Sequence, residues 1–136
     1  MILVDTSIWI DYLRGASREL TTHLEAGQVA IHPWVIGELA CGTLENRQTV
    51  LSLMGTMPTV VMADHQDMLT LIDTHQPIGR GIDYVDAHLI ASALLNHSMF
   101  WTGAKPCAAW RSIWAWPRDS SSARWQSRLR SDQPAQ

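Results

Sequence analysis

The sequence predicts an α/β fold in which helices cover a central parallel β-sheet. Short apolar segments alternate along the chain with longer segments whose apolar residues recur at helical spacing. The chain has 136 residues and is 46% apolar, which suits a single domain with a substantial core and excludes a disordered chain. Ligands of such folds bind at the carboxyl ends of the strands, so polar residues at those ends are the first candidates for a functional site.

The predicted elements follow one another in a regular alternation. They are a strand at 1–4, helices at 6–13 and 17–26, a short strand at 29–31, helices at 33–42 and 46–54, a strand at 59–62, a helix beginning at 64, a helix beginning at 83 and a strand at 98–102. This order favours parallel pairing, because a helix can carry the chain back between two strands.

In the first half, residues with start and stop preferences support these boundaries. The opening run 1–4 has no polar residue, as expected of a strand buried on both faces. Gly15 and Gly27 follow the first two helices, where glycine favours the turn that ends a helix. Ser17 is a suitable N-cap for the second helix, and Pro33 suits the first turn of the third.

The second half shows the same signals. Residues 59–62 are apolar and β-branched, and 98–102 contain two aromatic residues, so both are predicted strands. Asp64 and Asp83 stand before stretches with a helical apolar stripe and can cap them. Residues 76–81 are rich in glycine and proline and are predicted to form a loop.

The charge pattern separates an acidic body from a basic tail. Residues 1–102 hold four basic and eleven acidic side chains, whereas 103–136 hold six and two, which gives the whole chain a net charge of −3. An acidic body does not attract nucleic acid through its overall field, so a metal ion or the tail would have to mediate contact with phosphates.

Composition also bears on the compartment. No apolar run approaches the roughly 20 residues of a bilayer span, and no basic signal segment opens the chain. Two cysteines are too few for a disulfide framework and suit a reducing environment. We expect a cytoplasmic protein without a membrane segment.

Residues 103–136 form an atypical, irregular tail beside a domain at 1–102. They hold four of the seven tryptophans, but Ile113 and Leu129 are their only Ile, Leu, Val, Phe or Met residues. Back-translation of 104–117, read one base earlier, permits a sequence with helical apolar spacing and a glycine stop. We therefore hypothesise that the tail is a partly disordered, frameshifted reading. Stop codons in the neighbouring frame of the sequenced locus would refute this.

Three carboxylates lie at the end of a predicted strand or within predicted helices. Asp5 follows the first strand, Glu38 lies within an apolar helix, and Asp86 lies in the first turn of another. Structural alternatives exist for each. Asp5 could cap the helix after it, Glu38 could face water, and Asp86 could partner Asp83 at the helix start. If the three converge, their repulsion favours a hard cation such as Mg²⁺ or Mn²⁺, which can activate water toward a phosphodiester.

Three segments carry a resemblance to a known family. They are MILVDTSIWIDYLRG at 1–15, HPWVIGELACG at 32–42 and GRGIDYVDAHLIASALL at 79–95. In this order they resemble PIN domains of the VapC toxin type over roughly residues 1–102. The resemblance implies a PIN-like three-layer α/β/α fold with a central parallel sheet. It further implies a Mg²⁺-dependent endoribonuclease, with Mn²⁺ as an alternative ion, that is the toxin of a type II toxin–antitoxin pair.

The resemblance also assigns residues and partners. Asp5, Glu38 and Asp86 are carried over as catalytic, metal-binding acids, with Thr6 or Ser7 as a supporting hydroxyl. A VapB-type antitoxin, an RNA substrate and a homodimer are implied as partners. Three other residues are not carried over: Asp83 is interpreted as a helix cap, Asp11 as a surface residue and His88 as a residue that packs or caps.

One departure from the family pattern supports an alternative function. Such proteins usually follow the last strand with a Thr-x-Asp step, whereas this chain has Thr102, Gly103 and Ala104. Alanine cannot bind a metal, so the chain could be a degenerate toxin that binds its antitoxin with impaired catalysis. A phosphatase of the haloacid-dehalogenase type is disfavoured, because its motif needs an aspartate where Ser7 stands.

Overall fold

The computed structural model describes residues 1–75 and 82–103, so the predicted loop at 76–81 and residues 104–136 of the tail lie outside the described residues. The described elements are β1 (Ile2–Val4), α1 (Thr6–Leu13), α2 (Glu19–Glu25), β2 (Val29–Ala30), α3 (Pro33–Cys41), α4 (Arg47–Met54), α5 (His65–His75), α6 (Tyr84–Leu95) and β3 (Met99–Trp101). Within these ranges every helix is too short or too polar to cross a membrane.

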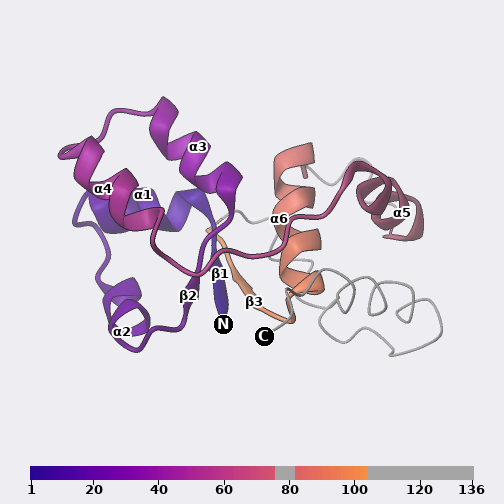
Figure 1. The fold of residues 1–136 in the computed structure, drawn as a ribbon, viewed down its shortest axis with the longest axis horizontal. Helices are drawn as coiled ribbons and strands as arrows, with labels where there is room; N and C mark the ends of the chain where they lie inside the picture. Colours follow the sequence, from indigo (N-terminus) through magenta and orange to yellow (C-terminus); the bar gives the residue numbers. More distant parts are fainter. Residues whose placement is uncertain (76–81, 104–136) are drawn as a thin grey trace.

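The strands form one parallel sheet in the order β2–β1–β3 (Figure 1). Ile2 in the central strand is paired with Val29 on one side and with Met99 on the other. Helices make both connections between strands, as parallel pairing requires. The three carboxyl ends therefore meet at one edge of the sheet, which we call the carboxyl edge.

Helices cover both faces of the sheet. α1 to α4 lie on one side and α5 and α6 on the other (Figure 1). Successive residues of β1 point to opposite layers: Val4 packs in the core with Trp9 and Val35, whereas Leu3 packs with Ala93 of α6. Burial of Leu3 and Val4, both 0% exposed, stabilises the fold by about 1.5–3 kcal/mol each. The three-layer α/β/α arrangement with a central parallel sheet is thus confirmed.

The strand predicted at 59–62 is wrong. Only an isolated bridge between Ile31 and Thr59 forms there. The backbone N–H and C=O of Val61 are instead bonded to the side-chain amide of Asn96, each at 3.0 Å. Because this amide satisfies both backbone groups, no neighbouring strand is needed.

The predicted helix boundaries are close to the observed ones, with one shifted cap. α2 begins at Glu19 with Arg18 at its N-cap, and the hydroxyl of Ser17 accepts a 3.4 Å bond from the N–H of Glu19. Gly15 and Gly27 follow α1 and α2 with φ angles of 73° and 66°, the left-handed conformation that glycine adopts without strain.

Candidate active site at the carboxyl edge

Asp5 is the buried carboxylate of the carboxyl edge. It follows β1 directly, caps the N-terminus of α1 and is 6% exposed. Its Oδ1 accepts a 2.7 Å hydrogen bond from the N–H of Thr6, while its own N–H donates to the carbonyl of Trp101 at 2.9 Å. The predicted capping alternative is therefore confirmed, and the cap holds the carboxylate between the end of β3 and the start of α1.

Two hydroxyl groups approach the other oxygen of this carboxylate. Oδ2 of Asp5 accepts a 2.6 Å bond from Oγ1 of Thr102 and a longer, 3.5 Å bond from Oγ of Ser7. Ser7 in turn accepts a bond from the N–H of Gly103 at 3.3 Å. Thr102 was not among the predicted site residues, although its position directly after β3 was a usable signal.

Glu38 joins this group through Thr6. It lies on α3 and is exposed to solvent, which confirms the alternative prediction that Glu38 faces water. Its Oε2 accepts a hydrogen bond from Oγ1 of Thr6. Thr6 therefore contacts Asp5 through its backbone and Glu38 through its hydroxyl, so the structure brings these three predicted residues together.

Asp86 lies in the first turn of α6 and takes part in a capping box. The carboxylate of Asp83 accepts a 2.8 Å bond from the N–H of Asp86, and Asp86 accepts one from the N–H of Asp83 at 3.4 Å. The capping roles predicted for both are confirmed. Asp83 and Asp86 are thus hydrogen-bonded to each other at the start of α6.

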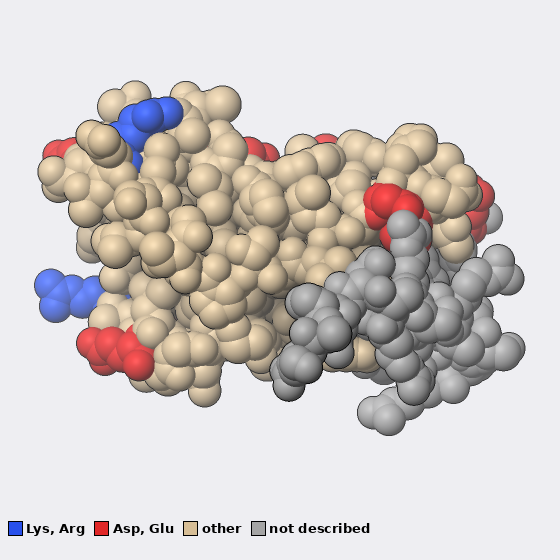
Figure 2. Space-filling view, in the orientation of Figure 1, with Lys and Arg blue, Asp and Glu red and all other residues tan. Residues whose placement is uncertain are grey.

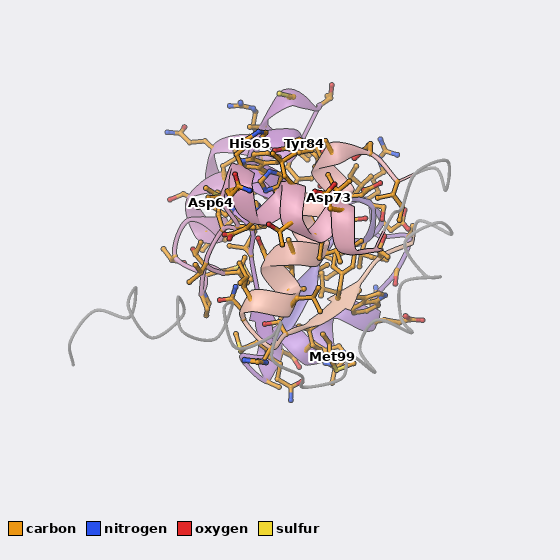
Figure 3. The ribbon with its side chains drawn as sticks, turned by 90° about the vertical axis from the view of Figure 1, so that its right-hand side faces the viewer. Asp64, His65, Asp73, Tyr84 and Met99 are labelled. Atoms are coloured by element: carbon orange, nitrogen blue, oxygen red, sulfur yellow. The ribbon has the colours of Figure 1, made fainter. Side chains whose placement is uncertain are left out.

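The start of α6 nevertheless belongs to the same end of the molecule as Asp5. α6 leads directly into β3, and Tyr84 at its start and Met99 at the start of β3 lie at opposite ends (Figure 3). Since β3 runs parallel to β1, the start of α6 lies toward the carboxyl edge. Among residues 1–75 and 82–103, however, no three His, Cys, Asp or Glu side chains gather closely enough to hold a metal ion.

The described residues bring little positive charge to the surface around this edge. In the described ranges, Arg14, Arg18 and Arg47 are the only Lys or Arg residues, and all three belong to the half formed by α1 to α4. On the face shown in Figure 2, the half that contains α5 and α6 has acidic but no basic side chains among the described residues. Asp11 is exposed, as predicted.

Two buried histidines pack between α3, which carries Glu38, and α6, which carries Asp86. Nδ1 of His32 accepts a 3.0 Å bond from the N–H of Trp34 and so caps α3, while its Nε2 bonds to Oγ of Ser92 on α6 at 3.1 Å. Burial and, secondarily, the nearby His88 lower the pKa of His32 to about 4. His88 is 5% exposed and packs against Trp34 and Tyr84, as predicted.

Comparison with known proteins places this arrangement in a family. No protein-family model matches the chain. Two curated sequences named Ribonuclease VapC32, from the CDC 1551 / Oshkosh and ATCC 25618 / H37Rv strains of Mycobacterium tuberculosis, are 40% identical to it over 106 residues, which is 77% of this chain and 86% of each relative. Given this identity over most of both sequences and the three-layer fold, the chain belongs to the VapC family of PIN-domain ribonucleases.

Proposed function

We propose that the protein is a metal-dependent endoribonuclease and the toxin of a toxin–antitoxin pair. The observation that carries this proposal is the buried carboxylate of Asp5 at the carboxyl edge, connected through Thr6 to Glu38. The relatives' name, Ribonuclease VapC32, supports RNA as the substrate. A VapB-type antitoxin as partner and a homodimer are further parts of the proposal.

The residues at this edge fit a magnesium ion in their donor chemistry. Mg²⁺ prefers oxygen ligands, is usually held by one or two carboxylates and keeps several waters, so three clustered acids are not required. Asp5 and Glu38 would hold the ion, with Asp86 supplied from the start of α6. The chemistry that Mg²⁺ provides when bound is polarisation of a phosphoryl oxygen and a lower pKa of water.

The chain's own contribution is to fix the orientation of its carboxylates. Thr102 and Ser7 donate to one oxygen of Asp5, and the N–H of Thr6 donates to the other. The hydroxyl of Thr6 orients Glu38 in the same way.

Cleavage of RNA by the purified chain tests the proposal. We expect cleavage products in Mg²⁺, none after chelation, and none from the Asp5→Asn variant in Mg²⁺. Cleavage that continues in the chelator would refute metal dependence. Cleavage by Asp5→Asn at the parent rate would refute the site.

A second candidate is a catalytically impaired toxin that binds its antitoxin. The alanine at position 104, where family members usually have a fourth acid, favours it. Co-expression with the antitoxin separates the two candidates. A complex that forms although the freed chain leaves RNA intact in Mg²⁺ would support the impaired toxin.

A further inference from the structure

Four ring side chains form a surface near the carboxylates, which we call the aromatic face: Trp34, His65, Tyr84 and His88. The ring centroids of Trp34 and His88 are 4.1 Å apart and those of Tyr84 and His88 are 4.7 Å apart. Nδ1 of His65 is hydrogen-bonded to the hydroxyl of Tyr84 at 3.0 Å, and Figure 3 shows these two residues together at one end of the molecule. The rings therefore come from three helices: α3, α5 and α6.

The aromatic face is more exposed to solvent than the buried core residues are. Tyr84 is 44% exposed, His65 is exposed and Trp34 is half-buried. Beneath them, the buried Nδ1 of His88 has no hydrogen-bond partner among the described residues. A buried polar atom without a partner is unfavourable, and native structures retain few of them.

The aromatic face lies next to the proposed active site. Trp34 and Glu38 are four residues apart on α3, so they share one side of the helix and are separated by about 6 Å along its axis. Tyr84 and Asp86 both lie in the first turn of α6. A base bound over the rings would therefore lie on the same side of α3 as Glu38.

We propose that the aromatic face stacks an unpaired nucleobase of the RNA substrate beside the bond that is cut. The proposal rests on the proposed ribonuclease function. Single-stranded RNA is recognised largely by stacking of its bases on aromatic side chains. α5 and α6 carry the rings His65, Tyr84 and His88 but no Lys or Arg, so stacking is the contact that these two helices can offer to a base.

Binding of short oligoribonucleotides to Tyr84 variants tests the proposal. The full chain with Asp5→Asn, which prevents cleavage, is titrated in Mg²⁺ with fluorescent oligouridine and with an abasic oligomer of the same length. Tyr84→Leu, which removes the flat ring but keeps an apolar side chain, is expected to weaken oligouridine binding about 5- to 100-fold. Tyr84→Phe keeps the ring and is expected to bind nearly as the parent does.

Controls distinguish stacking from a general structural effect. Leu69→Ala removes another exposed apolar side chain, on α5, and should leave both affinities unchanged. The abasic oligomer should bind all variants equally. Unchanged oligouridine binding in Tyr84→Leu, or an equal loss for the abasic oligomer, would overturn the proposal. So would loss of antitoxin binding with RNA binding intact, which would assign the aromatic face to the protein partner.

The outcomes also separate this proposal from the proposed function. If the chain with Asp5 intact cleaves RNA and Tyr84→Leu has the parent's KM, the nuclease stands and the stacking site is refuted. If no RNA is cleaved but oligouridine binding depends on the Tyr84 ring, the stacking site stands and the nuclease is refuted.

Discussion

Asp5 both caps α1 and presents the buried carboxylate, and these two roles can be separated by substitution. Asparagine is also a good N-cap, whereas alanine is not. We expect Asp5→Asn to keep the parent's stability in urea unfolding and to lose RNA cleavage. Asp5→Ala should lose cleavage and also about 1 kcal/mol of the free energy of unfolding. Equal stability of the two variants would contradict the capping role.

Thr102 orients Asp5 through a short hydrogen bond. Loss of this hydrogen bond should reduce the cleavage rate more than it reduces the stability of the fold. Thr102→Val keeps the shape of the side chain but removes the donor. Because groups that orient metal ligands typically contribute 10- to 100-fold, we expect a cleavage rate reduced by about that factor. Thr102→Ser restores the hydroxyl and should recover most of the rate. Cleavage that is kept in Thr102→Val and lost in Thr102→Ser would indicate a steric role instead.

Hydrogen bonds of the site between neighbouring residues could be predicted from the sequence, whereas those between distant residues could not. Thr6 and Ser7 adjoin Asp5 in the chain, so their support of its carboxylate could be predicted from adjacency. The bond from Thr102 spans 97 positions and that from Thr6 to Glu38 spans 32. Contacts between such distant residues depend on strand order and helix placement, which local residue preferences do not specify.

At the scale of elements, α6 allows a matched test of two neighbouring acids. Asp83 and Asp86 both take part in the capping box, but only Asp86 is proposed to serve the metal site. Asparagine can accept the same backbone hydrogen bonds in either position. We therefore expect similar stabilities for Asp83→Asn and Asp86→Asn, with cleavage kept in the first and lost in the second. Similar cleavage by both would remove Asp86 from the site.

His32, which caps α3 and is hydrogen-bonded to Ser92 on α6, is expected to make the stability of the fold depend on pH. The pKa of His32 is about 4 in the folded chain and about 6.5 when unfolded, so the unfolded chain binds the proton more tightly. The contribution of neutral, buried His32 to the free energy of unfolding is complete above pH 6.5. It is lost as the pH falls toward 4, by about 3 kcal/mol in total. His88, whose pKa burial also lowers, acts in the same direction.

Urea unfolding of the parent and of His32→Asn across this pH range measures the effect. Asparagine can cap α3 but does not titrate. A shallower pH dependence in His32→Asn is expected. An unchanged slope would show that His32 is not the responsible group.

Elements whose ends carry local signals were predictable, and one that depends on a distant partner was not. Asp83 and Pro33 stand at helix starts where their side chains act locally. The segment at 59–62 has the composition of a strand, but the backbone N–H and C=O of Val61 are bonded to the amide of Asn96, 35 positions later in the chain. Composition indicates that a segment can be extended; it does not indicate which group will pair with it.

At the scale of the whole molecule, the acidic body is the feature that a nuclease has to overcome. Residues 1–75 and 82–103 hold eleven acidic side chains and three arginines, so the field of this part of the molecule repels a phosphate chain. A divalent cation at the carboxyl edge would reverse the local sign of the charge where cleavage occurs. A cation shared between the start of α1 and the start of α6 is therefore the central element of the proposed function.

A Mg²⁺ titration followed by NMR at the carboxyl groups of Asp5 and Asp86, in parallel with the cleavage rate, tests this most directly. The account predicts that both signals shift over the same Mg²⁺ concentrations, that cleavage rises over that range, and that Asp83→Asn changes neither. Signals of Asp5 and Asp86 that respond at different concentrations, or not at all while RNA is cleaved, would contradict it.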